Sequence, residues 1–349
     1  MSEFQQVLNI ITGREKGTGP LNLNKVFKNV CKGLDLLGQP YVINRNPRYY
    51  NWNWIYNSKY GFMEMAVLGK PALIGPNIAI LPIELPQIRP KLNNCIYLQP
   101  CEWAAESWRV QGFTECPVHA WPVGIDCDSF KLNRNNVSAN HVMIYFKARH
   151  PDLLDETLAI VKANNLVPHT IVYGKYNEDE YKEALATCSF GIWLGRHESQ
   201  GIALQEALAS GIPLIVIDAK SFFDAYGDEY QFPSSLKSFK VTSAPYFDER
   251  CGIIIDDVKE LNKAIEELKS NLAHYKPREF VEQELSLQVS AQKLIDLFRL
   301  LPIENSESSK ISVRKRNKPF IISAKARFYK EISKFVIHKS DSGIKYPVG

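Results

Sequence analysis

The sequence predicts an α/β protein of two domains, each built on a parallel β-sheet. At 349 residues the chain is too long for one ordinary hydrophobic core, and its length suits two domains of about 120 to 180 residues. From residue 142 onward, short apolar runs alternate with helical patterns of roughly 9 to 15 residues. Such alternation is typical of a parallel sheet that helices cover on both faces.

The N-terminal half opens with a βαβ pattern. The pattern predicts a strand at 7–11, a glycine-containing loop at 12–20, a helix at 22–37 and a second strand at 41–44. Gly17 and Gly19 in the loop either form a tight turn or let the backbone approach a ligand. Further strands are predicted within 66–77 and at 94–98, and a helix at 103–112.

The second half continues the alternation of strands and helices. Strands are predicted at 142–146, 169–173, 190–194 and 213–217. Helices are predicted between and after them, at 152–164, 178–186, 202–209, 257–268 and 278–301. In a parallel sheet, ligands bind beyond the carboxyl ends of the strands. Polar residues that directly follow these strands are therefore the candidates for a binding site.

Composition argues against a membrane-spanning, secreted or zinc-stabilised protein. Hydrophobic residues make up 45% of the chain and charged residues 23%, and no apolar run reaches the ~20 residues of a transmembrane helix. The N-terminus lacks the pattern of a signal peptide. Seven scattered cysteines without a C-x-x-C pair predict neither a disulfide framework nor a zinc site. We therefore expect a cytoplasmic protein without a structural zinc site.

The positive charge is concentrated at the C-terminus. Residues 304–349 carry eleven Lys and Arg against four Asp and Glu, a net charge of +7, so the rest of the chain carries −3. A basic amphipathic helix is predicted at 323–338. Residues 310–339 could bind an anionic membrane surface, or the helix could dock on the body of the protein. No motif supports a nucleic-acid partner.

The run from Trp193 to Asp218 is the most informative segment. It reads as a strand, a polar turn, an apolar helix, a glycine and a second buried strand. Glu198 and Glu206 are eight residues apart, which corresponds to ~12 Å along a helix. Glu206 lies among apolar residues, and a buried carboxylate requires hydrogen-bond donors. The alternative is an exposed Glu on a half-buried helix.

This segment resembles the E-x7-E signature of retaining glycosyltransferases of the family-4, or group-1, type. The resemblance implies the GT-B fold, in which two Rossmann-like domains face one another across a cleft. The run Val118–Asp126, with its Pro-x-Gly-x-Asp, is similar to the crossing between the two domains. The expected parts are an N-terminal acceptor domain (1–121), a donor domain (122–275), a helix that packs back toward the first domain (276–303) and a basic tail (304–349).

The resemblance also assigns roles around the signature. Glu198 would contact the donor sugar and Glu206 the ribose. The backbone amides of 199–202 would face the diphosphate, because the first N–H groups of a helix are unpaired and favour an anion. The residues of that turn are Ser199, Gln200, Gly201 and Ile202. Lys147 and Arg149 would neutralise the leaving diphosphate, and which of the two dominates stays open.

The remaining candidates surround the predicted nucleotide. Gly174 would allow a nucleobase to approach, with Tyr173 or Tyr176 stacking on it, although the two tyrosines could equally pack at the sheet edge. His197 is either a polar pocket residue or a structural histidine. Gly17 and Gly19 match a glycine-containing loop that approaches donor and acceptor in the family.

We therefore expect a metal-independent enzyme that transfers a sugar from a nucleotide-diphosphate-sugar to a glycan, lipid-linked or protein acceptor. The chain departs from the family in two respects. Residues 1–118 contain no histidine, and one βα unit before residue 173 is absent. A non-catalytic scaffold that binds a nucleotide sugar, or a sugar-nucleotide epimerase, remains as an alternative.

Overall fold

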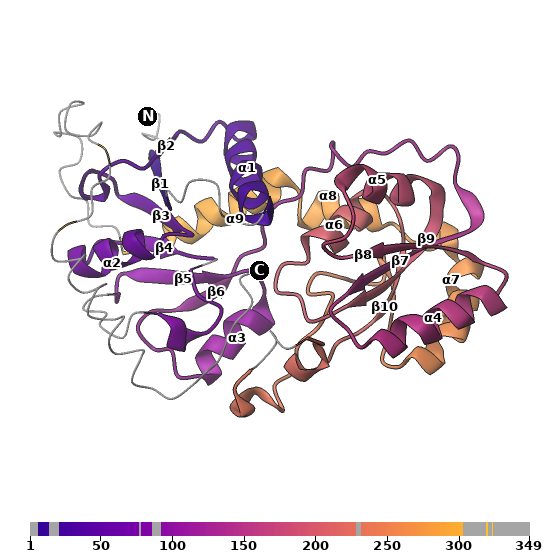
Figure 1. Cartoon of the computed structure of the whole chain (residues 1–349). Helices are drawn as coiled ribbons and strands as arrows, with labels where there is room; N and C mark the ends of the chain where they lie inside the picture. The colour runs from indigo at the N-terminus through magenta and orange to yellow at the C-terminus, as the bar shows by residue number, and fades with distance from the viewer. Residues whose placement is uncertain are drawn as a thin grey trace. The chain divides into compact units, whose positions relative to one another are not determined.

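The computed structural model describes residues 6–13, 21–76, 78–85, 92–227 and 232–302, together with Pro319 and Ser323; the side chains of 21–24 are not included. These residues form two compact units (Figure 1). Unit 1 contains the residues up to Gly124 and those from Leu287, and unit 2 contains 125–286. The chain first passes from unit 1 to unit 2 between Gly124 and Ile125, inside the run Val118–Asp126. None of the described helices is long and apolar enough to span a membrane.

Unit 1 is built on a six-stranded, fully parallel sheet with the order β2-β1-β3-β4-β5-β6. Its strands are β1 (Leu8–Thr12), β2 (Tyr41–Ile43), β3 (Trp52–Tyr56), β4 (Ala72–Ile74), β5 (Cys95–Gln99) and β6 (Val118–Ala120). Its helices are α1 (Leu21–Leu36), α2 (Lys59–Leu68), α3 (Glu102–Val110) and α9 (Leu287–Arg299). Large aromatic side chains such as Trp54, Tyr97 and Trp108 fill the core.

The structure differs from the sequence expectations at two places in unit 1. Strand β3 was not predicted, because Asn53 interrupts its apolar run; the Asn53 side chain is buried and hydrogen-bonded to Asn9 and to the carbonyls of Pro47 and Tyr50. The predicted strand within 66–77 is shorter, because α2 continues to Leu68 and the left-handed backbone of Gly69 ends it. Only β4 is extended in that range.

Unit 2 is built on a five-stranded parallel sheet with the order β11-β10-β9-β7-β8. Its strands are β7 (Ser138–Lys147), β8 (Val167–Val172), β9 (Cys188–Gly195), β10 (Leu214–Ile217) and β11 (Gly252–Ile255). Its helices are α4 (Pro151–Ala163), α5 (Glu178–Thr187), α6 (Ile202–Ala209), α7 (Leu261–Ser270) and α8 (Pro277–Glu284). The α/β class with two parallel sheets is therefore confirmed.

The predicted helix at 278–301 is two helices. The backbone leaves the helical conformation at Leu285, whose carbonyl accepts a hydrogen bond of 2.8 Å from the N–H of Ile125. Helix α8 stays in unit 2, and α9 packs beside α1 in unit 1 (Figure 1). Helices α1 and α9 approach closely at Gly33 of α1, where a Cβ atom would lie 2.5 Å from the carbonyl oxygen of Leu287 of α9.

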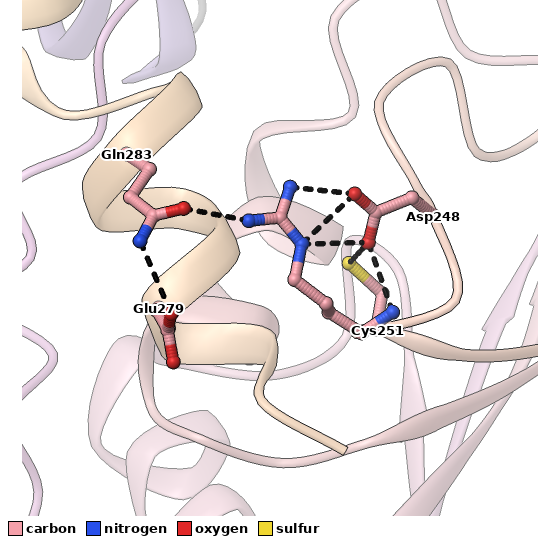
Figure 2. A network of polar contacts seen from close by, with 5 residues as sticks. Asp248, Cys251, Glu279 and Gln283 are labelled. Atoms are coloured by element: carbon pink, nitrogen blue, oxygen red, sulfur yellow. Dashed lines mark hydrogen bonds and ion pairs between the residues drawn. The ribbon is translucent and has the colours of Figure 1, made fainter. Parts of the chain in front are cut away.

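Helix α8 supports α6, the helix that carries the signature. Arg250, in the turn before β11, binds both carboxylate oxygens of Asp248 and donates to the Gln283 side chain on α8. Figure 2 shows Gln283 and Glu279 on α8, with Asp248 and Cys251 on the opposite side of this network. Arg278 of α8 donates 2.8 Å to the carbonyl of Ala209, the last residue of α6. The carboxyl end of α6 is therefore fixed by an arginine.

Candidate functional site

The candidate site lies at the carboxyl edge of the unit 2 sheet, where β7, β9 and β10 end side by side. Lys147, the last residue of β7, is in register with Gly195, the last residue of β9. The main-chain carbonyl of Lys147 accepts 2.9 Å from the N–H of Arg196, so the turn after β9 starts against β7. The carboxyl edge of a parallel sheet is where ligands bind in such folds.

Lys147 and Glu198 form an ion pair at this edge. Lys147 Nζ lies 2.5 Å from Glu198 Oε1, and the two side chains are 10% and 12% exposed. Lys147 Nζ also lies 4.2 Å from the centre of the Tyr173 ring, close enough for a cation–π contact. The N–H of Glu198 donates 3.0 Å to the carbonyl of Thr242, which fixes the backbone of the turn. Three of the predicted residues are thus in contact.

Arg149 lies beside this pair but contacts the main chain. Its Nη1 donates to the carbonyls of Gly195 and Ile217, at 3.0 and 3.2 Å, and so joins the ends of β9 and β10. Burial lowers the pKa of Arg149, while Asp224 and Asp218 act in the opposite direction. In this structure Arg149 holds strand ends together, and Lys147 is the cation in contact with Glu198.

The amino end of α6 faces the same edge. Gly201 is the cap residue that precedes the helix, with φ of 66°, a left-handed conformation that disfavours other residues. The turn before it is held by Gln205, whose side-chain nitrogen donates 2.6 Å to the carbonyl of Gln200. The predicted amides from Ser199 to Ile202 therefore belong to a fixed turn at a helix amino end, where an anion is favoured.

Glu206 is buried within a group of tyrosines. It is 5% exposed on α6. Burial raises the pKa of Tyr181 well above its usual range, and the nearby Glu206 charge raises it further. Burial also raises the pKa of Tyr176, to which Glu206 contributes in the same direction. Gly174, in the loop before Tyr176, has φ of 77° and open space where a side chain would be.

Sequence reasoning missed two residues of this edge. Tyr145 is buried on β7, stacks on Trp193 at 3.8 Å between ring centres and is hydrogen-bonded to Tyr176. A tyrosine inside a predicted buried strand was the available signal, since its hydroxyl requires a partner. Asp218 directly follows β10, and its Oδ1 accepts from Thr242 and from the N–H and hydroxyl of Ser243.

His197 is enclosed beside the ion pair. It is 4% exposed, and its ring centre lies 4.7 Å from that of Phe222 and 5.2 Å from that of Phe232. Burial lowers the pKa of His197 well below its usual value, and the charges of Arg196 and Lys147 act in the same direction. His197 is therefore neutral at neutral pH.

Acid is expected to destabilise the protein through His197. In the unfolded chain this histidine takes up a proton near pH 6.5, whereas in the native protein its pKa is much lower. The free energy of unfolding is therefore highest above pH 6.5 and falls as the pH drops below 6.5. Urea unfolding from about pH 7.5 to about pH 5.5 measures this slope. The variant His197→Gln is expected to lose less stability over the same range. An equal loss in wild type and variant would contradict the assignment.

Several predicted features fall outside the described residues. These are Gly17, Gly19 and the tail from residue 304, apart from Pro319 and Ser323. Ser323 donates its N–H, at 2.8 Å, to the buried carboxylate of Glu64 on α2. Among the residues that the structure describes, no group of three or more His, Cys, Asp or Glu side chains could hold a metal ion.

Comparison with known proteins gives a match in fold only. No family model and no curated protein matches the sequence. The structure is similar to that of HepE from Anabaena in complex with UDP, with a TM-score of 0.53 and 10% identity over 85% of this chain and all of that chain. It is also similar to the catalytic domain of starch synthase IV from Arabidopsis thaliana bound to ADP and acarbose, with a TM-score of 0.53 and 10% identity over 84% of this chain and 99% of that chain.

A third similar structure is an α-glucosyltransferase in complex with UDP and a 13-mer DNA, with a TM-score of 0.51 and 9% identity. It covers 84% of this chain and all of that chain. At 9 to 10% identity, these matches show a likeness of fold alone. The chain therefore has the GT-B fold, with two parallel α/β sheets in separate units.

Proposed function

We propose that the protein is a glycosyltransferase that takes a sugar from a nucleotide-diphosphate-sugar and transfers it, with retention of configuration and without a metal, to a glycan, lipid-linked or protein acceptor. The observation that carries the proposal is the Lys147–Glu198 ion pair beside the amino end of α6, where Gly201 is the cap residue. The similar structures of HepE and of the α-glucosyltransferase, both in complex with UDP, support a nucleotide-containing donor.

The donor would extend along the carboxyl edge from β8 toward β9 and β10. Its base would lie against Tyr173 and Gly174, directly after β8, and its ribose hydroxyls would donate to Glu206. The diphosphate would bind the amides at the start of α6, because helix dipole and unpaired N–H groups both favour an anion there. The sugar would then lie at Glu198, on the far side of Lys147 from β8.

Lys147 would be the main cation for the leaving diphosphate. Its ammonium group already lies within the site, and it can exchange Glu198 for a phosphate oxygen. A fixed cation stabilises the charge that develops on the leaving phosphate. Arg149 would act as a positioning residue, since its Nη1 binds the carbonyls at the ends of β9 and β10.

Thermal-shift titration with UDP, GDP, ADP and CMP tests the proposed pocket. We expect one nucleoside diphosphate to raise the melting temperature of the wild type, and Glu206→Gln to weaken its binding by about tenfold, because a ribose hydroxyl loses a charged acceptor. Glu267→Gln, on the exposed face of α7, is the matched control and is expected to bind like the wild type.

Two outcomes would contradict the proposal in different ways. Unchanged nucleotide affinity in Glu206→Gln would remove the ribose assignment. No stabilisation by any of the four nucleotides would remove the donor pocket itself and favour a non-catalytic scaffold. Hydrolysis of a nucleotide sugar in the absence of acceptor would distinguish a transferase from a protein that binds the donor alone.

A further inference from the structure

The connection between β10 and β11, residues 218–251, is unusually long for an α/β unit. A crossover between neighbouring parallel strands usually contains an α-helix, and loops beyond about 12 to 15 residues without regular structure are uncommon and often functional. The described part of this connection contains two 3-10 turns, Phe222–Asp224 and Ser234–Leu236, and no strand or α-helix. Its length therefore calls for a physical account.

Both ends of the connection are fixed to the candidate site. At its start, Asp218 accepts three hydrogen bonds from Thr242 and Ser243, which closes the connection into a loop. The carbonyl of Thr242 then accepts the N–H of Glu198. The loop base is thus built into the turn that carries the ion pair.

The interior of the connection is an aromatic cluster. Phe222 is 2% exposed, and its ring centre lies 4.7 Å from Phe232 and 6.1 Å from Phe239. The His197 ring packs against Phe222 and Phe232. The described part of the connection consequently has its own small core, which packs against His197.

Two aromatic residues of the same segment point to solvent. Phe223 and Tyr226 are 49% and 51% exposed. Their backbone is held, since Ser221 and Asp224 cap the turn and the N–H of Tyr226 donates 2.9 Å to the carbonyl of Ala148, between Lys147 and Arg149. The Tyr226 ring also meets the His150 ring at 4.7 Å between centres. These are exposed rings on a fixed backbone.

We propose that Phe223 and Tyr226 form an acceptor platform, on which a pyranose ring of the acceptor stacks. A pyranose presents an apolar C–H face and a rim of hydroxyl groups, which suits an aromatic face with polar neighbours. His150 and Asp152 lie next to the platform, with His150 Nδ1 3.3 Å from Asp152 Oδ2, and can bind hydroxyls. Because the backbone that carries the two rings is already held, binding requires little ordering of the main chain.

The direction of the donor identifies the occupant as the acceptor, and this step rests on the proposed function. The base end of the donor would lie at β8, which flanks β7 on the side away from β9 and β10. The sugar end would lie at Glu198, and the ring of the preceding residue, His197, packs against Phe222, the residue before Phe223. The group that adjoins the transferred sugar is the acceptor, so the platform is placed to hold it.

Saturation-transfer NMR tests the platform with methyl pyranosides of glucose, galactose, mannose and N-acetylglucosamine, and with their disaccharides. The stabilising nucleoside diphosphate is present at saturation, so that the donor pocket is occupied. We expect at least one saccharide to bind the wild type and to bind the double variant Phe223→Ala, Tyr226→Ala at least about tenfold more weakly. Tyr226→Phe keeps the ring and is expected to retain most of the binding.

The control is Val167→Ala, which shortens a comparably exposed apolar side chain at the start of β8, at the opposite edge of the unit 2 sheet. Saccharide binding that is absent in the wild type, or equal in wild type and double variant, would overturn the platform. Nucleotide stabilisation, measured on the same samples, separates this failure from that of the proposed function. If nucleotides stabilise the protein and the double variant leaves saccharide binding unchanged, the donor pocket is supported and the platform is not.

Discussion

Replacing Lys147 with methionine is expected to lower the rate of donor turnover by about 10²- to 10³-fold. Methionine keeps much of the side-chain length but cannot stabilise the charge on the leaving diphosphate. The Glu198 carboxylate also loses its cation, which leaves a second negative charge beside that phosphate. Initial rates of nucleoside diphosphate release from the preferred donor measure the effect.

Lys220→Met is the matched control for this variant. Lys220 also follows a strand at the carboxyl edge of unit 2, but it is 54% exposed and pairs with Asp256. We expect its turnover to remain near that of the wild type. If both variants, with folding verified by urea denaturation, turned over at wild-type rates, Lys147 would have no part in catalysis.

Replacing Glu198 with glutamine is expected to change binding and turnover in opposite directions. Lys147 would lose its carboxylate partner and interact more strongly with a phosphate, so we expect the nucleoside diphosphate to bind about tenfold more tightly. Turnover is expected to fall, because the donor sugar loses a charged acceptor for its hydroxyls. Calorimetric titration gives the Kd, and initial rates give kcat.

The opposite signs distinguish this account from a purely structural role. A variant that merely loosened the turn after β9 would bind the nucleotide more weakly and turn over more slowly. The control is again Glu267→Gln, on the exposed face of α7. Weaker nucleotide binding in Glu198→Gln, with the control unchanged, would show that the pair does not compete with phosphate.

Much of unit 2 could be predicted from the sequence, because its strands are apolar and are separated by clear helical patterns. The predicted strands at 142–146, 190–194 and 213–217 lie within or overlap β7, β9 and β10. Unit 1 was less readable. Asn53 interrupts the apolar run of β3. Its buried side chain is stabilised by hydrogen bonds to the carbonyls of Pro47 and Tyr50, and the local sequence pattern does not predict these bonds.

The candidate site was predictable in its parts and not in its contacts. The signature identified Glu198 and Glu206, and the strand-end rule identified Lys147. The pairing of Lys147 with Glu198 depends on the neighbouring positions of β7 and β9, and strand order is not visible in one sequence. For the same reason the carbonyls that bind Arg149 could not be foreseen, and neither could the bond between Tyr226 and Ala148.

Hydrogen–deuterium exchange with and without the stabilising nucleoside diphosphate tests the central claim most directly, because it locates the bound nucleotide on the chain. The account predicts slower exchange in peptides that contain the start of α6 and the end of β7, including the amides of 199–202. Unchanged exchange in those peptides, with protection confined to other parts of the chain, would contradict it.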